Sequence, residues 1–271
     1  MRCDTKYPIF LVHGMGFREN KHIGYWGRIP KALEDNGAIV TCSTQDANGS
    51  IEGNAEQLKK HLTAFIKESG AEKVNVIAHS KGGLEARYLI SSLGMSDKIA
   101  SLTTLSTPHN GSVTVDKLLK FPQPIIKFGC KAVDIWFRII GDSSPETYKA
   151  VLSFRTADAE KFNADNPDSE KVYYQSYAFV MKNMLSDIFM WLPWAVVNHF
   201  EGENDGLLAP SAVKWTNFKG VIRGCKSRGI SHCDEVDMRR NKLSKKSESS
   251  GISDITEFYI SVAEELKNMG Y

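Results

Sequence analysis

The first hundred residues alternate short apolar runs with longer segments whose apolar residues fall on one helical face. Buried strands are predicted at residues 7–12, 39–43, 74–78 and 99–106. Helices are predicted between them at residues 25–35, 51–69 and 83–93. In the longest helix, one stripe is formed by Leu58, Leu62, Phe65 and Ile66. Strands that alternate with helices are typical of a mostly parallel sheet with helices on both faces.

The alternation stops after Pro108. No clear strand is predicted within residues 112–168, but strands return at residues 172–180 and 221–223. A final helix is predicted at residues 254–269, because Asp254 followed by Glu257 is a variant of the capping box. This order predicts one α/β domain over residues 1–271 with a helical insertion at residues 112–168, rather than two independent domains.

Composition and charge narrow the class of protein. Apolar residues are 42% and charged residues 24% of the 271 residues, which is enough to bury a core and excludes predominant disorder. The net charge of +2 gives no general reason to expect nucleic-acid binding. The N-terminal segment lacks the apolar run of a signal peptide. We therefore expect a cytoplasmic protein as given, or a secreted one if a leader has been removed. Five scattered cysteines mildly favour a reducing compartment.

The segment around Ser80 carries the strongest chemical signal. A predicted strand runs into Ala-His-Ser-Lys-Gly-Gly at residues 78–83, and a helix is predicted to follow at once. A serine on such a sharp turn needs small residues two positions before and two positions after it, because larger side chains would collide. Ala78 and Gly82 fill these positions. We therefore interpret Ser80 as a nucleophile rather than as a serine in an ordinary turn.

A serine nucleophile needs a histidine base and an acid that orients the base. In a strand–turn–helix setting of this kind, the chain order is serine, acid, histidine. Among the histidines after Ser80, only His232 lies late enough to leave room for an acid before it. Residues 201–206 offer three carboxylates, and Asp205 is preferred because it lies in a tight Asn-Asp-Gly turn. Glu203 is the alternative.

Hydrolysis through an acyl-enzyme also needs two backbone N–H groups that face the tetrahedral oxyanion. One is expected from Lys81, the residue after the nucleophile, at the start of its helix. The other is expected from Met15, in the His-Gly-Met-Gly turn at residues 13–16 that follows the first strand. The side chain of Lys81 would place a cation near the oxyanion or point to solvent.

Together these motifs resemble those of the bacterial triacylglycerol lipases of lipase family I. The resemblance runs through most of the chain, and its further matches are Tyr25-Trp26, residues 107–112, Phe162-Asn163 and residues 232–236. It implies the α/β-hydrolase fold and hydrolysis of acyl esters by Ser80, Asp205 and His232. An acyltransferase or thioesterase would use the same acyl-enzyme. A non-catalytic binding module is a further alternative, which the intact triad residues disfavour.

The resemblance also implies a structural calcium ion next to the loop of the catalytic histidine. One carboxylate ligand would be Asp234, two residues after His232, and the other would be Asp187, upstream of the catalytic acid. Calcium prefers carboxylate and carbonyl oxygens. Such an ion would stabilise the loop and take no part in the chemistry. The basic stretch at residues 239–246 is expected to be a solvated loop, with attraction to an anionic lipid surface as the alternative.

An apolar segment at residues 125–140 lies within the helical insertion. Its four charged residues are spaced by 4, 3 and 4 positions, which predicts a helix with one narrow polar stripe. We interpret it as a lid over an acyl-binding cleft, with a buried core helix as the alternative. A second apolar block at residues 184–197 is expected to line the same cleft or to face a lipid interface. The candidate substrate-binding residues are Phe17, Phe128, Trp136, Phe137 and Trp191.

Overall fold

The computed structural model describes residues 1–17, 24–224, 228–244 and 251–271. Among these residues, six parallel strands form one sheet in the order β2-β1-β3-β4-β5-β6. The strands are β1 (Ile9–Val12), β2 (Val40–Cys42), β3 (Val74–His79), β4 (Ile99–Leu105), β5 (Tyr173–Val180) and β6 (Phe218–Arg223). Each lies at or within a few residues of its predicted position, so the predicted parallel sheet is confirmed.

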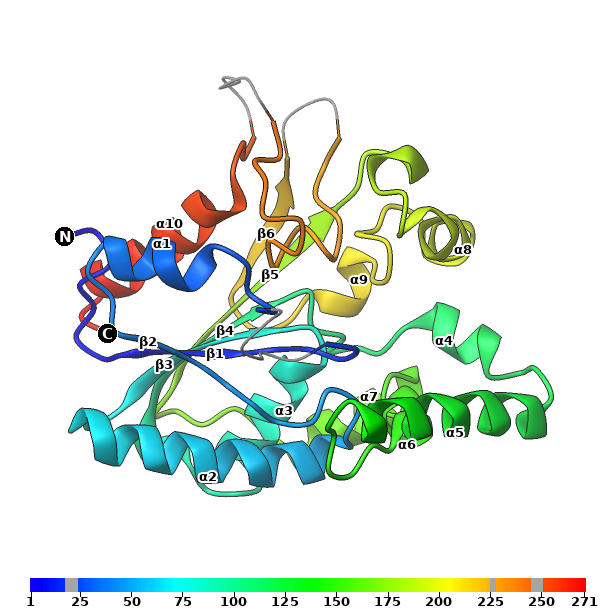
Figure 1. Cartoon of the computed structure of the whole chain (residues 1–271), viewed down its shortest axis with the longest axis horizontal. Coiled ribbons are helices and arrows are strands. Elements are labelled where there is room, and N and C mark those ends of the chain that lie inside the picture. The colour runs from blue at the N-terminus through cyan, green and yellow to red at the C-terminus, as the bar shows by residue number, and fades with distance from the viewer. Residues whose placement is uncertain (18–23, 225–227, 245–250) are drawn as a thin grey trace.

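Helices cover both faces of the sheet (Figure 1). One face is covered by α1 (Ile29–Asp35) and α10 (Ile255–Asn268), and the other by α2 (Ile51–Ser69) and α3 (Lys81–Ile90). Because successive strand side chains point to opposite faces, Ile9 and Leu11 of β1 join the core under α1 and α10, whereas Phe10 joins the core under α2. The central strands are therefore buried on both faces.

Two helix boundaries differ from the sequence prediction for local reasons. The helix predicted from residue 25 begins at Ile29, because Pro30 is tolerated only in the first turn. The helix predicted from residue 83 begins at Lys81, directly after the serine. The final helix begins where expected, because the side chain of Asp254 accepts a hydrogen bond from the backbone N–H of Thr256.

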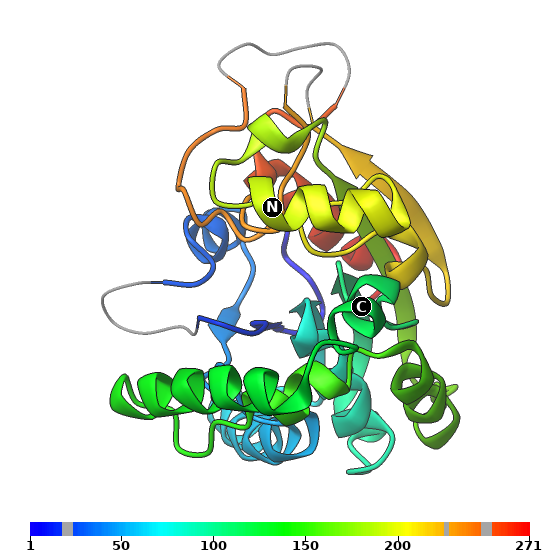
Figure 2. The same ribbon diagram turned by 90° about the vertical axis from the view of Figure 1, so that its right-hand side faces the viewer.

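Residues 112–168 fold as helices between β4 and β5. They form α4 (Val113–Leu118), α5 (Gln123–Ile139), α6 (Thr147–Leu152) and α7 (Thr156–Asp165). α5 packs against α6 but buries none of its residues, and the side chain of Trp136 is 61% exposed. The core-helix alternative for residues 125–140 is therefore wrong. In Figure 2, α8 (Trp191–Glu201) lies above the ends of the strands and α5 lies below them. Among the described residues, no helix has both the length and the apolarity needed to cross a membrane.

The turn from β3 into α3 holds Ser80 in a strained backbone conformation, with φ 54° and ψ −131°. A Cβ atom on Gly82 would lie 2.4 Å from the carbonyl oxygen of His13 and 2.9 Å from that of Val12. Ala78 is completely buried in the core under α2 and α3. The two positions that flank the serine therefore admit only small residues, because β1 passes directly behind the turn.

We predict that Gly82→Ala lowers the free energy of unfolding by about 2 kcal/mol or more, because the new methyl group must displace the β1 backbone. Gly129→Ala is the control, since a Cβ atom there would meet no atom within 4 Å and alanine is the better helix former. Urea denaturation of both variants measures the difference. Equal changes in stability would contradict this account of the turn.

Candidate active site

Ser80 lines a pocket of about 200 Å³ at the end of the sheet. Met15 and His232 line the same pocket, so the expected nucleophile, base and oxyanion donor meet in one place. The rest of the wall is apolar and consists of Pro108, Val115, Phe154, Leu207 and Leu208. A small apolar pocket with these polar groups at one point is suited to an acyl group whose carbonyl carbon lies at Ser80.

His232 is held by Asp205 through two hydrogen bonds. The Nδ1 atom of His232 lies 2.8 Å from Oδ2 of Asp205, and the backbone N–H of His232 donates to the carbonyl oxygen of Asp205 at 2.8 Å. When Nδ1–H donates to the carboxylate, Nε2 is left as the basic nitrogen. Glu203, the alternative acid, lies at the surface, where Arg223 donates to it at 2.9 Å. The structure thus brings Asp205, and not Glu203, to the histidine.

Asp205 is a completely buried carboxylate. Burial alone would raise its pKa, but the positive charge on His232, the hydrogen bond from His232, and the backbone N–H groups of Leu207 and Leu208 together lower it to about 2. The Asn-Asp-Gly turn makes this possible, because it lets the carboxylate fold back onto the two following N–H groups. Asp205 is therefore ionised at neutral pH and orients the imidazole.

Lys81 takes its expected place at the first position of α3, but its side chain does not. The ammonium group is buried, donates to the carbonyl oxygen of Gly49 at 2.8 Å and pairs with Glu85, one turn further along α3. Glu85 also accepts hydrogen bonds from Asn54 at 2.7 Å and from Gln45 at 2.9 Å. The sequence led us to expect this side chain beside the oxyanion or in solvent. It lies in neither place. Its backbone N–H remains the candidate donor at the N-terminus of the helix.

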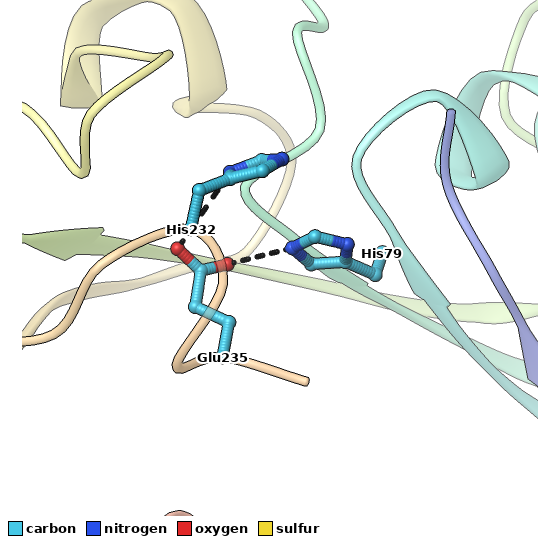
Figure 3. A group of neighbouring side chains, drawn as sticks. All are labelled: His79, His232 and Glu235. Carbon is cyan, nitrogen blue, oxygen red and sulfur yellow. Dashed lines mark hydrogen bonds and ion pairs between the residues drawn. The ribbon is translucent and has the colours of Figure 1, made fainter. Parts of the chain in front are cut away.

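Behind the pocket, a buried chain of hydrogen bonds joins the Gly14 turn to the histidine loop. The backbone N–H of Gly14 donates to the Tyr25 hydroxyl at 3.0 Å, and this hydroxyl lies 2.7 Å from Nδ1 of His79. Nε2 of His79 lies 3.1 Å from Glu235 (Figure 3). Glu235 also accepts a hydrogen bond from the hydroxyl of Ser106 at 3.0 Å. Sequence reasoning missed this chain. His79 directly precedes Ser80, and Glu235 lies three residues after His232, so both were inside recognised motifs. The motifs gave no sign that these two side chains contact each other.

Burial sets the protonation of the side chains in this series of hydrogen bonds. It raises the pKa of Glu235 well above its usual value, and the negative charge of Asp205 adds to the effect. It lowers the pKa of His79 well below its usual value, and the positive charge on His232 adds to that. Both shifts favour the uncharged forms, a protonated Glu235 and a neutral His79. Ligand atoms of His79, His232 and Glu235 lie within 4.8 Å of one another, but a protonated Glu235 and a His79 engaged at both nitrogens are poor metal ligands.

The two candidate calcium ligands, Asp187 and Asp234, do lie together, because the hydroxyl of Ser231 donates to both. Each also faces a guanidinium group, from Arg239 and Arg228 respectively. Arg239 belongs to the basic stretch expected to be solvated, and for this residue the expectation is wrong because its side chain turns inward onto Asp187. Residues 245 and 246 of that stretch lie outside the described residues.

The predicted substrate-binding residues do not line the Ser80 pocket. Phe17, Phe128, Trp136 and Trp191 are exposed and Phe137 is half-buried, all of them away from the pocket wall. Because α5 packs on α6, the insertion reaches the pocket instead through Val115 of α4 and through Phe154. Leu207 and Leu208 are positioned by the turn at Asp205, a link that the Asn-Asp-Gly motif in the sequence already contained.

Comparisons with known proteins show similarity to thioesterases and lipases. Residues 8–182, about two thirds of the chain, match the family model of palmitoyl protein thioesterases. A triacylglycerol lipase of Vibrio cholerae is 30% identical over 264 residues, which cover 86% of this chain and 80% of that protein. Triacylglycerol lipase 2 of Saccharomyces cerevisiae is 29% identical over 286 residues, covering 100% and 78%. The Staphylococcus hyicus lipase structure matches with a TM-score of 0.72 at 16% identity, covering 99% of this chain and 97% of that one, which shows the shared fold.

We predict that the melting temperature of Glu235→Gln, measured relative to that of wild type, increases as the pH rises from about 5 to about 8. Wild-type Glu235 keeps its proton in the folded protein, whereas in the unfolded chain it loses the proton above its usual pKa of 4.5. The folded state therefore loses stability in wild type as the pH rises through this window, and glutamine removes that loss. Glu203→Gln, at the surface, should show no such trend. Parallel melting curves for Glu235→Gln and wild type would contradict a protonated Glu235.

Proposed function

The chain belongs to the palmitoyl protein thioesterase family and is an α/β-hydrolase of the lipase type, and on this premise we propose that Ser80, His232 and Asp205 form its catalytic triad. A serine carboxylic-ester hydrolase needs these three groups in this order. The observation that carries the proposal is that the Asp205–His232 pair lies at the same pocket as the strained turn that presents Ser80. On its motifs, we further propose that the chain is a member of lipase family I.

The proposed reaction has two halves that pass through one acyl-enzyme. Oγ of Ser80 attacks the ester carbonyl carbon while its proton moves to Nε2 of His232, and Asp205 stabilises the resulting imidazolium. The backbone N–H groups of Met15 and Lys81 would hold the oxyanion. The alcohol then leaves with the proton from His232. Water repeats the sequence, losing its proton to His232, and releases the acid while Ser80 recovers its proton.

Two exposed apolar surfaces point to acyl substrates held at a lipid interface. On α5, Ile125, Phe128 and Ile139 are each more than two thirds exposed. On the segment that leads into α8, Leu185, Ile188 and Phe189 are each more than three quarters exposed. Each Å² of such surface costs about 25 cal/mol in water, which contact with lipid would remove. We propose that residues 112–168 act as the lid region and that these surfaces meet the lipid phase.

A thioester substrate is the second candidate, and the palmitoyl protein thioesterase match favours it. The acyl-enzyme would be the same, because only the leaving group changes from an alcohol to a thiol. Rates on p-nitrophenyl esters from acetate to palmitate, compared with rates on a long-chain acyl thioester, decide between the two. A higher kcat/KM for the thioester at equal chain length would show that thioester hydrolysis is the main activity.

We predict that Ser80→Ala lowers kcat by a factor on the order of 10⁵ or more, because the hydroxyl forms the covalent intermediate. The melting temperature should stay close to that of wild type. Labelling with a fluorophosphonate should modify wild type at Ser80 and leave the variant unmodified. Residual turnover near the wild-type rate would overturn the assignment.

The acid is tested with a matched pair of carboxamide variants. Asp205→Asn should lower kcat by a factor on the order of 10⁴, because the histidine keeps its place but loses the charge that stabilises the imidazolium. Glu203→Gln is the control and should be nearly silent, since among the described residues its carboxylate pairs with the exposed Arg223. The reverse pattern would make Glu203 the acid.

We predict that Trp136→Ser lowers activity on emulsified long-chain esters and leaves activity on short soluble esters nearly unchanged. The indole is 61% exposed on α5, so its loss should remove contact with lipid but little packing. Ile39→Ser is the control, because Ile39 is equally exposed, at 62%, but lies outside the two apolar surfaces. A large fall in melting temperature with equal loss on both substrates would show that Trp136 supports the fold instead.

A further inference from the structure

Two buried carboxylates lie directly beside the loop that carries His232. Asp187 is 1% and Asp234 is 4% exposed, and Oγ of Ser231 donates to Oδ2 of both, at 2.6 and 2.9 Å. The backbone N–H of Phe189 donates to the other oxygen of Asp187 at 2.9 Å. A pair of buried, adjacent carboxylates is stable only when cations or donors neutralise it.

The cations here are two arginine side chains. Nη2 of Arg239 lies 2.5 Å from Oδ2 of Asp187, and its Nε lies 3.8 Å from Oδ1 of Asp234. Nη2 of Arg228 lies 2.8 and 3.1 Å from the two oxygens of Asp234, which is one guanidinium nitrogen shared by both oxygens. Nε of Arg228 donates to the backbone carbonyl of Ser186 at 2.6 Å. The guanidinium groups therefore use both carboxylates and a neighbouring carbonyl.

These are the kinds of oxygen that a calcium ion would need. Calcium in proteins takes several carboxylate and carbonyl oxygens, and its double positive charge requires anionic ligands that are not already neutralised. The two aspartates and the two arginines sum to zero charge, so a divalent ion added to them would leave an excess of two positive charges in a buried site. The donor set present therefore does not fit the calcium ion implied by the family resemblance.

We propose that Arg228 and Arg239 replace that calcium ion and hold the His232 loop in position by charge pairing. Ser231 immediately precedes His232, so its hydrogen bonds to Asp187 and Asp234 fix the backbone from which the base extends. The guanidinium group of Arg228 donates hydrogen bonds to both oxygens of Asp234, and that of Arg239 forms an ion pair with Asp187. Arg228 and Arg239 are positioning residues, and the chain keeps this loop ordered without a metal.

The test compares calcium responses in wild type and in Arg239→Met, which keeps most of the side-chain volume and removes the charge. Wild type should melt at the same temperature in EDTA and in millimolar calcium, and should bind no calcium in equilibrium dialysis. Arg239→Met should melt at a lower temperature in EDTA. Calcium should then raise its melting temperature and bind to it, because two buried carboxylates now lack one of their cations.

Arg223→Met is the matched control, since Arg223 pairs with the exposed Glu203 at a similar distance of 2.9 Å. It should change neither the melting temperature nor the calcium response. The rate of ester hydrolysis adds a second readout: in Arg239→Met it should fall in EDTA and recover with calcium, but not with magnesium, which needs a smaller octahedral site.

Two results would overturn the proposal. One is a wild-type protein that binds calcium and melts at a higher temperature with it. The other is an Arg239→Met variant that gains nothing from calcium, whether it is as stable as wild type or less stable, because Arg239 would then not occupy the place of a cation. If Arg239→Met does not fold in EDTA, the test is whether it refolds when calcium is added. The wild-type measurements do not depend on this variant.

Discussion

A single buried charge, the carboxylate of Asp205, governs the arrangement of the whole site. An ion with no solvent contact is stable only if the protein supplies enough donors. Here two backbone N–H groups hold one oxygen and His232 holds the other. Burial raises the pKa of the second carboxyl group nearby, Glu235, well above its usual value, and the charge of Asp205 adds to this shift. The buried charge that faces His232 thus also favours a protonated carboxyl group behind it.

This constraint links parts of the chain that are far apart in sequence. The turn after β1, the end of β3 and the loop after β6 meet through Tyr25, His79 and Glu235. The turn with the proposed oxyanion donor and the loop with the proposed base are therefore not positioned independently. A shift of either one must break a buried hydrogen bond, which costs more than breaking one in water. These hydrogen bonds therefore set the position of the turn after β1 relative to the loop after β6.

The fold was predictable because its signals are local. The strand pattern, the stripe on α2 and the small residues around Ser80 each depend on neighbours in the sequence, and the preference for Asp205 came from a three-residue turn. The errors arise where a side chain is held by a distant partner. Lys81 is drawn inward by the carbonyl oxygen of Gly49, and Arg239 by Asp187, more than fifty residues away. The exposure of α5 could not be predicted from the sequence either, because the pattern of apolar residues in a helix is the same whether it packs on the core or faces solvent.

The structure divides the work of an ester hydrolase between two kinds of surface. Of the groups that would carry out the chemistry, Ser80 sits at the end of the buried strand β3, and His232 is held by Asp205 at 2.8 Å. The apolar faces that would meet the acyl chain lie on α5, which buries no residue of its own. A helix with so little packing can change position at small cost, whereas the triad cannot. Adaptation to different acyl chains can therefore occur in the insertion without disturbing the alignment of serine, histidine and aspartate.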